Sequence, residues 1–394
     1  MNDSSQQFDC VISGAGMVGA ACALALAQLG LTVALIDKQA PAPFDEQQPF
    51  DLRVSAISLA SEQLLQQLAV WPAILAMRTC VYRRLGVWEM DAAAVEFNAA
   101  DIGQTHLGHI IENRIIQLAL WQQIEQQANI QLFCPEQVQS FVQQPQTVQL
   151  SLVSGITLIT PLLIAADGAL SAIRQQAKIG VTGWNYQQSA MIINVATQLP
   201  QQDITWQKFL PTGPVAMLPL VGQQASLVWY HQQADIARLA QLSKQQLQLQ
   251  IQRYFPQQLG EVKVLKQASF SLTRQHANAY YQGQVVVIGD AAHTINPLAG
   301  QGVNLGFKDV LALQTSIAEA ISAGKQYYQP SVLQQYQHNR RLDNSLMMSG
   351  MDLFYQGFSH PSTLVKAARN VALTLVDKIP MAKRKLLRYA CGID

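Results

Sequence analysis

The sequence has few charged residues and almost no net charge. Of its 394 residues 13% are charged, the formal net charge is +1 and the mean hydropathy is +0.09. Such a chain has no global field to attract nucleic acid, so any electrostatic targeting must come from local clusters. Its length and its 49% hydrophobic content predict a substantial core divided over two or three packed units.

Cysteine is scarce and scattered along the chain. The five residues are odd in number and never in Cys-x-x-Cys spacing: Cys10, Cys22, Cys80, Cys134 and Cys391. This pattern excludes a disulfide framework and a cysteine zinc site, and it favours reduced thiols in a cytoplasmic protein. No metal-ligating cluster, Ser-His-Asp set or Cys-His pair is apparent either, so no metal is expected and no catalytic side chain is assigned.

Long hydrophobic runs are absent as well. The Ala/Leu-rich run over residues 20–29 is far shorter than the roughly 20 apolar residues that a membrane span needs. We interpret it as a buried helix. The N-terminus carries Asp3 where a secretory signal has basic residues, so no signal peptide is expected.

A glycine-rich motif near the N-terminus lies in the context of a dinucleotide site. The apolar segment 8–13 predicts a buried strand, "GAGMVG" follows at 14–19, a helix is expected over 18–30, and "LTVALID" ends at Asp37. Glycines let a pyrophosphate approach the backbone, the helix N-terminus supplies N–H groups, and the acid can accept hydrogen bonds from ribose hydroxyls. An ordinary βαβ turn with chance glycines is the alternative.

A second glycine-rich stretch, "GDAAHTINPLAGQGVNLG", lies late in the chain at 289–306. The β-branched strand over 284–290 ends at Asp290, and a helix is expected to begin near Gly302. An acid beside a helix N-terminus suits a ligand with hydroxyl groups and an electron-rich ring, and FAD has both. Asp290 can accept from the ribityl chain, while the pyrimidine edge of the flavin can face the N–H groups of Gly300, Gln301 and Gly302. We interpret His293 as structural rather than as an acid or base.

The remaining patterns give a coarse organisation. Asp51-Leu52-Arg53 opens a helical pattern that continues through Leu68, and residues 111–124 show helical periodicity. The block from 191 to 270 is mostly β-like, with one glutamine-rich helix over 244–255, and helices are expected beyond Pro330. The β-rich block suggests a second domain.

Three motifs in this order resemble the single-component FAD-dependent aromatic hydroxylases: the fingerprint at Gly14, the "ADG" that contains Asp167-Gly168, and "GDAAHTINPLAGQGVN". The similarity covers nearly the whole chain. The segments "DLRVSAIS", "ENRIIQLALW" and "SGMDLFYQGFS" are similar to the ubiquinone-biosynthesis branch. This resemblance implies an α/β fold: a Rossmann-like FAD-binding domain of the p-hydroxybenzoate hydroxylase type, an inserted antiparallel β-sheet substrate domain and a helical C-terminal region.

The expected domain boundaries follow from this fold and from the β-rich block. We expect a discontinuous FAD-binding domain over 1–75, 100–180 and 275–330, a substrate domain over 76–99 and 181–274, and a C-terminal helical region over 331–394.

The resemblance also implies roles for individual residues. The ADP half of FAD would be held by Gly14, Gly16, Gly19 and Asp37. Arg53 would lie on the flavin side, Asn113 near the central portion of the cofactor and Asp290 on the ribityl chain, while Asp167 and Gly168 belong to a motif associated with FAD and the nicotinamide donor. The predicted cofactor set is completed by Pro297, Gly300, Gln301, Gly302 and Asn304.

Each of these roles has an alternative. Arg53 could be a surface ion-pair partner, Asn113 a helix cap and Asp167 a turn former. The family usually has Glu at the end of the second strand, where this chain has Asp37. Asp is one methylene shorter, but we expect it still to reach a ribose.

The implied activity is that of an FAD-dependent monooxygenase in ubiquinone biosynthesis. It would hydroxylate the ring of a polyprenylated benzoquinol or phenol with O2 and NAD(P)H, through a flavin C4a-hydroperoxide. The protein must then exclude water and hold the ring over the flavin. Trp229 and Tyr230 are candidates for the pocket wall, although either could be a core residue.

Two other classes of function compete with this reading. One is a different flavin or nicotinamide oxidoreductase, such as a dehydrogenase or a halogenase, but the halogenase signature Trp-x-Trp-x-Ile-Pro is absent. The other is a flavin-binding scaffold without activity inside a biosynthetic complex.

The C-terminal segment from Pro361 onward is basic. Seven basic residues stand against Asp377 and Asp394, a formal +5 in a chain of +1: Lys366, Arg369, Lys378, Lys383, Arg384, Lys385 and Arg388. Interleaved apolar residues suggest peripheral contact with the inner face of the membrane, from which a polyprenylated quinol must be drawn: Leu364, Val371, Leu375, Leu386, Leu387 and Tyr389. Packing on the FAD-binding domain and docking to a partner enzyme are the alternatives.

Overall fold

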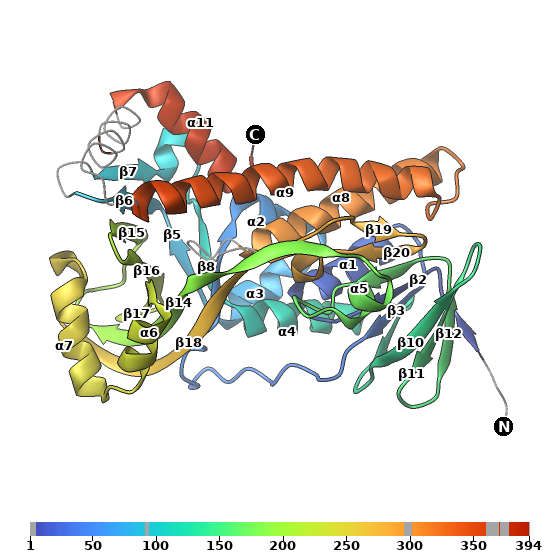
Figure 1. Cartoon of the computed structure of the whole chain (residues 1–394), viewed down its shortest axis with the longest axis horizontal. Helices are drawn as coiled ribbons and strands as arrows, with labels where there is room; N and C mark the ends of the chain where they lie inside the picture. The colour runs from blue at the N-terminus through green and yellow to red at the C-terminus, as the bar shows by residue number, and fades with distance from the viewer. Residues whose placement is uncertain (1–4, 91–93, 295–301, 360–369, 371–377, 394) are drawn as a thin grey trace.

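The computed structural model describes residues 5–90, 94–294, 302–359, 370 and 378–393 (Figure 1). A six-stranded sheet forms the centre of one part of the molecule. Its strand order is β19-β20-β13-β2-β3-β9, and every neighbouring pair is parallel except β19 with β20. The strands are β2 (Cys10–Ser13), β3 (Val33–Ile36), β9 (Ile130–Phe133), β13 (Leu163–Ala165), β19 (Tyr281–Gln282) and β20 (Val285–Val287).

The parallel strands are short and almost wholly apolar because helices cover them. Helix α1 (Met17–Ala27) packs against α4 (Asn113–Ile124) and α8 (Gly302–Ser322). Every residue of β2, β3, β13 and β20 is buried, as expected for a parallel sheet with both faces covered. The fingerprint strand, helix and second strand therefore form where the sequence predicts them.

An eight-stranded sheet forms the second large layer. Its order is β21-β18-β14-β17-β16-β15-β6-β7, antiparallel throughout except for the pair β15 and β6. The strands are β6 (Arg84–Trp88), β7 (Val95–Asn98), β14 (Val181–Thr197), β15 (Ile204–Leu210), β16 (Gly213–Leu220), β17 (Gln224–Gln232), β18 (Val262–Ala277) and β21 (His293–Thr294). Helices α6 (Gln233–Ala240) and α7 (Lys244–Tyr254) lie against it (Figure 1).

Smaller elements complete the fold. A four-stranded sheet contains β1 (Gln6–Gln7), β10 (Val138–Gln143), β11 (Val148–Leu152) and β12 (Thr157–Thr160), and a three-stranded sheet contains β4 (Val54–Ser58), β5 (Thr79–Tyr82) and β8 (Gly108–Glu112). The other helices are α2 (Leu59–Gln67), α3 (Trp71–Met77), α5 (Ala172–Gln176), α9 (Pro330–Ser359) and α11 (Pro380–Cys391), with 3-10 turns η2 (Ala99–Ile102), η3 (Gln257–Leu259) and η4 (Gly289–Ala291). The long helix α9 runs beside α8 and extends toward β15 (Figure 1).

The structure confirms the predicted α/β fold class, which combines a Rossmann-like parallel layer with an antiparallel sheet and C-terminal helices. Several local predictions were wrong. Residues 54–58 form strand β4 rather than the start of a helix, because they pair with β8, Val54 opposite Glu112 and Ile57 opposite His109. The helix begins only after Ser58, whose side chain accepts a hydrogen bond from the Ser61 N–H. Likewise α4 begins at Asn113, two residues later than predicted, and the β-rich block contains the additional helix α6.

Two expectations about composition can be compared with the structure. All five cysteines are free thiols, and only Cys134 is not fully buried. Of the helices that the structure describes, none combines the length and the hydropathy that crossing a bilayer requires.

Candidate functional site

The glycine loop after β2 contains two glycines that the fold itself requires. Gly14 has φ +102°, and a Cβ at this position would lie 2.4 Å from the carbonyl oxygen of Ala166. A Cβ on Gly19 would lie 1.8 Å from the carbonyl oxygen of Gly14. These two positions let the loop, the start of α1 and the end of β13 pack closely.

Gly16 is different, because no described residue occupies the space beside it. Its φ of −65° and ψ of −178° suit any residue, and a Cβ here would meet no heavy atom within 4 Å. Gly16 is the N-cap of α1, so the unpaired N–H groups of the first helical turn lie beside this open space. A glycine with open space at a helix N-terminus forms a cradle for an anionic group.

Asp37 binds the glycine loop directly, a contact that the sequence did not predict. Its Oδ2 accepts a hydrogen bond from the Ala15 N–H at 2.6 Å, and its Oδ1 accepts one from the Gln39 N–H at 3.1 Å. The Ala15 carbonyl in turn accepts from Trp121 Nε1 at 2.8 Å. Carboxylate oxygens have two lone pairs each, so Asp37 keeps acceptor capacity for a hydroxyl while it fixes the loop.

One carboxylate oxygen of Asp167 receives no hydrogen bond from the described residues. Its Oδ2 accepts from the Ile173 N–H at 3.3 Å, a contact with the first turn of α5 (Ala172–Gln176) that does not by itself show the alternative role as a turn former. Its Oδ1 is buried and has no hydrogen-bond partner. Buried polar atoms almost always have a partner, so this oxygen fits a donor supplied by a bound group. Beside it, Gly168 has φ +87° and open space where a Cβ would lie.

Asp290 lies in a tight turn immediately after β20. The turn requires Gly289, which has φ +58° and whose Cβ position lies 3.2 Å from Val18 in α1. The Asp290 side chain is exposed to solvent, yet surrounding protein desolvates the carboxyl and raises its pKa, against the lowering charges of His293 and Arg53. The strand predicted to continue to Asp290 ends at Val287.

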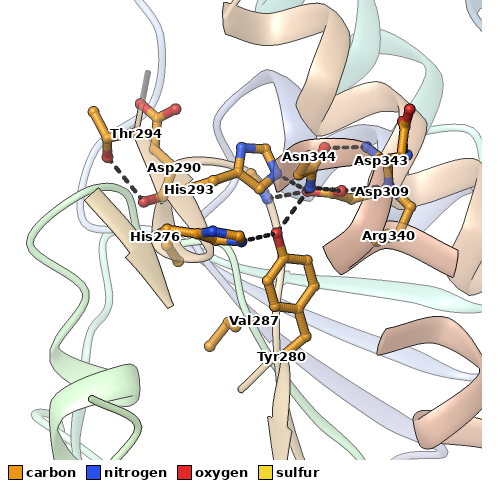
Figure 2. Close-up of polar contacts among 12 residues, drawn as sticks. His276, Tyr280, Val287, Asp290, His293, Thr294, Asp309, Arg340, Asp343 and Asn344 are labelled. Atoms are coloured by element: carbon orange, nitrogen blue, oxygen red, sulfur yellow. Dashed lines mark hydrogen bonds and ion pairs between the residues drawn. The ribbon is translucent and has the colours of Figure 1, made fainter. Parts of the chain in front are cut away.

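A buried acid, Asp309 in α8, holds this turn in place (Figure 2). Its Oδ2 accepts from the Gly289 N–H at 2.9 Å and lies 2.5 Å from His293 Nε2, while its Oδ1 accepts from Arg340 Nε at 2.8 Å. Burial alone would raise the pKa of Asp309, but the charges of His293 and Arg340 lower it to about 2. His293 therefore pairs with a buried carboxylate instead of facing solvent.

Helix α9 continues this polar cluster (Figure 2). Arg340 also donates to Asn344, whose Nδ2 donates to Tyr280 Oη at 2.9 Å. His276 Nε2 lies 2.8 Å from the same hydroxyl. Burial, with further contributions from His293 and nearby arginines, lowers the pKa of His276 to about 4. These residues were not predicted from the sequence. Asp309, Arg340 and Asn344 are polar residues at buried positions of helices, and this pattern is the signal that could have identified them.

Arg53 and Asn113 are adjacent to each other and near the Asp290 turn. The Asn113 N–H donates to the Arg53 carbonyl at 3.0 Å, and Asn113 Oδ1 accepts from Ser55 Oγ at 2.7 Å. The N-cap of α4 is Glu112, so the alternative role of Asn113 as a helix cap was wrong. The Arg53 side chain is exposed and forms no ion pair with any described residue, so the structure does not show the alternative ion-pair role.

The segment before Arg53 is anchored by buried charge. Glu112 is 2% exposed; its two oxygens pair with Arg78 at 2.9 and 3.0 Å, and Oε1 also accepts from the Asp51 N–H at 2.7 Å. Arg114 in α4 pairs with the Asp51 carboxylate at 2.8 Å. These contacts fix the backbone that presents Arg53.

The late glycine stretch is described at 289–294 and again from Gly302 onward. Pro297, Gly300 and Gln301 lie outside the described residues. Gly302 begins α8, and a Cβ there would meet nothing within 4 Å. The Asn304 side chain is buried and bonded to the protein, donating to the Ala56 carbonyl at 2.8 Å and accepting from Ser61 Oγ at 2.7 Å. It therefore joins α8 to β4 and α2.

The two pocket-wall candidates point to opposite faces of β17. Trp229 is 2% exposed and packs edge-on against Phe255, with ring centroids 5.3 Å apart, in the apolar cluster beneath α7. This is the packing of a core residue, which was the alternative. Tyr230 is also buried, on the other face, with Ala190 and Leu272.

The predicted cofactor-binding motifs lie together at one edge of the parallel sheet. Gly14 and Asp37 follow β2 and β3, Asp167 follows β13, and Asp290 follows β20. These are the carboxyl ends of four neighbouring parallel strands, the edge at which open α/β sheets bind ligands.

Comparisons with known proteins agree with this arrangement. The family described as "FAD binding domain" matches residues 7–349. The 3-demethoxyubiquinol 3-hydroxylase of Escherichia coli (strain K12) is 44% identical over 390 residues, covering 99% of this chain and 100% of that protein. Ubiquinone hydroxylase UbiL of Rhodospirillum rubrum is 31% identical over 387 residues, covering 98% and 89%. The crystal structure of p-nitrophenol 4-monooxygenase from Pseudomonas putida matches with a TM-score of 0.82 at 16% identity, covering 99% of each chain.

Proposed function

Because this chain belongs to the FAD-binding aromatic hydroxylase family of ubiquinone biosynthesis, we propose that it hydroxylates the ring of a polyprenylated benzoquinol. It is an FAD-dependent monooxygenase that uses O2 and NAD(P)H. The observation that carries the proposal is the edge of the parallel sheet, where an open glycine cradle, a buried acceptor without a donor and an exposed acid meet.

The residues at this edge fit FAD. The open space at Gly16 suits the pyrophosphate, and Asp37 lies where it can accept from the ribose. The unpaired Oδ1 of Asp167 and the exposed carboxyl of Asp290 offer acceptors for the hydroxyl groups of the cofactor. Arg53 adds a positive charge close to Asp290. When bound, FAD supplies the activation of O2 and the transfer of electrons from NAD(P)H, for which side chains have no equivalent.

The eight-stranded sheet would supply the substrate side. Asn194 in β14 donates from Nδ2 to the carbonyls of Phe50 and Asp51 at 3.1 and 3.2 Å, so one face of this sheet meets the segment that leads to Arg53. Asn194 lies opposite Ser226 of β17, so the two side chains are on the same face of the sheet. Tyr230 is four positions after Ser226 in the same strand and, because side chains alternate, is on that face too. We place the ring-binding pocket on this face, with Tyr230 rather than Trp229 beside it.

The domain division in this proposal is that expected from the sequence. The FAD-binding domain comprises 1–75, 100–180 and 275–330, the substrate domain 76–99 and 181–274, and the helical region 331–394. The joining of β6 and β7 to β14–β18 in one sheet supports the assignment of the separate segment 76–99 to the substrate domain.

The ring position is a finer proposal. We propose that the substrate is 2-octaprenyl-3-methyl-6-methoxy-1,4-benzoquinol or a homologue with another tail length. The 44% identity over the whole length of the E. coli 3-demethoxyubiquinol 3-hydroxylase, against 31% for the R. rubrum ubiquinone hydroxylase, supports this choice.

The experiment is a reconstitution with defined substrates. The FAD-loaded protein is incubated with NADPH or NADH, O2 and a set of prenylated phenols and benzoquinols, and the products are identified by mass spectrometry. We expect one substrate to gain a single oxygen atom, taken from labelled O2, together with substrate-dependent NAD(P)H consumption. A protein that binds FAD but consumes no NAD(P)H with any quinol would support the scaffold alternative instead.

We further propose that α11 contacts the membrane surface from which this substrate is drawn. Leu387 and Cys391 are buried against the protein, so part of the helix packs on the fold. Its outer surface combines Met381, 81% exposed, and Tyr389, 40% exposed, with basic residues that attract anionic lipid. These basic residues include Lys385 and Arg388. Leu364, Val371 and Leu375 lie outside the described residues.

Vesicle binding tests this contact with a matched control. Arg384→Gln combined with Lys385→Gln removes two exposed charges, whereas Lys383 is only partly exposed and lies 5.7 Å over the ring of Phe97. The double variant is expected to lose salt-sensitive co-sedimentation with anionic vesicles, while Lys383→Gln retains most of it. Equal co-sedimentation of the parent and double variant at low salt would favour a partner enzyme as the route of delivery.

A further inference from the structure

A cluster of three ligand-type side chains lies outside the residues assigned to the cofactor. Glu62 lies in α2, His106 in the segment before β8, and His109 in β8. Glu62 Oε2 is 2.8 Å from His106 Nε2 and 3.2 Å from His109 Nδ1, and the three ligand atoms all lie within 4.8 Å of one another. We propose that these residues bind a divalent transition metal ion, with Zn²⁺ as the best match.

One ligand atom of the cluster makes no hydrogen bond within the described residues. The Nδ1 of His109 is buried and makes no hydrogen bond, although it lies close to Glu62. Buried polar atoms without a partner are rare and call for an explanation. Within the part of the chain that is described, Glu62 forms its ion pairs with these two histidines.

Neighbouring side chains orient the ligand atoms toward one another. Thr105 Oγ1 lies 2.9 Å from His106 Nδ1, which leaves Nε2 for the centre of the cluster. Gln66 Nε2 donates to Glu62 Oε1 at 3.0 Å, which leaves Oε2. Trp71 packs edge-on against the His109 ring, with centroids 5.0 Å apart. Such outer contacts fix tautomer and ring orientation at metal sites.

The ligand chemistry favours zinc. Two imidazole nitrogens and one carboxylate form a set found at zinc sites, with a water in the fourth position. The side chains of Glu62 and His109 are 9% and 10% exposed, whereas that of His106 is 19% exposed, so solvent can reach one side of the cluster. Ligand atoms about 2.0–2.1 Å from a zinc ion lie roughly 3.3 Å apart in tetrahedral geometry; the two distances from Glu62 Oε2 are close to this value, and the two histidine nitrogens already lie within 4.8 Å of each other.

The position indicates a structural role rather than a role in oxygen chemistry. The ion would connect α2 to β8 and to the segment before it, two parts of the chain separated by more than forty residues. Ser61, next to Glu62 in α2, donates a hydrogen bond to Asn304 of α8. The ion would therefore stabilise the position of α2 between the three-stranded sheet and α8. This inference does not depend on the proposed substrate, because none of the three residues is assigned to FAD.

Metal titration of the FAD-loaded protein tests the proposal. After chelator treatment and dialysis, calorimetric titration with Zn²⁺ is expected to show one saturable site per chain and a raised unfolding temperature. Glu62→Gln, which is nearly isosteric, and His106→Gln should each weaken Zn²⁺ binding roughly tenfold or more, with FAD content unchanged. The matched control is His231→Gln: His231 Nδ1 lies 2.8 Å from Asp235, whose other partner is Arg238 rather than a second histidine, and its loss should leave the affinity unchanged.

Cobalt substitution of the parent protein provides a second measurement that needs no variant. Bound Co²⁺ should give visible absorption bands of a four- or five-coordinate site with nitrogen and oxygen ligands, and Zn²⁺ should displace them. The proposal is overturned if the parent takes up no Zn²⁺ saturably at concentrations up to about 1 mM. It is also overturned if Glu62→Gln and the parent bind equally, or if Co²⁺ shows only the spectrum of the hydrated ion.

Discussion

Replacement of Gly16 by valine should separate cofactor binding from folding. A Cβ at Gly16 meets no atom of a described residue within 4 Å, and its φ of −65° suits an L-residue. Because Gly16 is the N-cap of α1, where valine is less favourable than glycine, we expect the free energy of unfolding to change by no more than about 1 kcal/mol. The branched side chain would occupy the space that we assign to the pyrophosphate.

The expected loss of FAD affinity is much larger. Hydrogen bonds to charged groups contribute about 1.5–3 kcal/mol each. If the valine at position 16 prevents two such bonds between the helix N-terminus and the pyrophosphate, binding weakens by about 3–6 kcal/mol, at least about a hundredfold. Gly19→Ala is the matched comparison, because its Cβ would lie 1.8 Å from the Gly14 carbonyl. That variant should lose about 1–3 kcal/mol of stability or more, and FAD binding with it.

Two measurements on the apoprotein distinguish the variants. Urea denaturation gives the free energy of unfolding, and titration with FAD, followed by quenching of flavin fluorescence, gives the affinity. The expected pattern is near-parental stability with lost affinity for Gly16→Val, and loss of both for Gly19→Ala. If Gly16→Val titrates with FAD like the parent, the glycine turn is merely structural and the reasoning is refuted.

Three further predictions concern the Asp290 turn and the cluster behind it. Asp290→Ala should weaken FAD binding at least about tenfold, because it removes a charged acceptor; an unchanged titration would contradict the assignment. Asp309→Asn removes the buried carboxylate that pairs with His293 and Arg340, while Arg340 keeps its ion pair with Asp343, so urea denaturation should show a loss of about 1.5–3 kcal/mol; a loss within error of zero would count against the role of the cluster. His276 has a folded pKa of about 4, below that of the unfolded chain near 6.5. Stability should therefore fall as the pH drops from about 6.5 toward 4, and His276→Gln should flatten this dependence; identical profiles would exclude His276 as its source.

The parts of the site that sequence could predict are those written in consecutive residues. The spacing of Gly14, Gly16 and Gly19 between a strand and a helix, with Asp37 at the end of the next strand, follows from local geometry alone. The inner parallel strands β2, β3, β13 and β20 are wholly buried, so their short apolar runs are visible without tertiary information. Strand β20, which precedes the late glycine motif, and the start of α8, which follows it, are also visible in the sequence alone.

The structure corrected predictions where local patterns are ambiguous. Residues 54–58 fit a helical and a strand pattern equally well, and pairing with β8 decided between them. Alternation along β17 shows that Trp229 and Tyr230 face opposite ways, but it does not show which face meets α7. Only the packing of Trp229 against Phe255 identifies its side as the core.

What the sequence by itself determined is thus the set of backbone turns that can accept a dinucleotide, because each turn depends on a few neighbouring residues. What only the tertiary structure decided is which distant charges meet. Asp309 reaches both His293 and Arg340, and Glu62 reaches histidines 44 and 47 positions away. Such encounters depend on how helices cross strands, and no sequence spacing encodes them. The charge pairs that hold the Asp290 turn and the proposed metal site are for this reason properties of the folded chain.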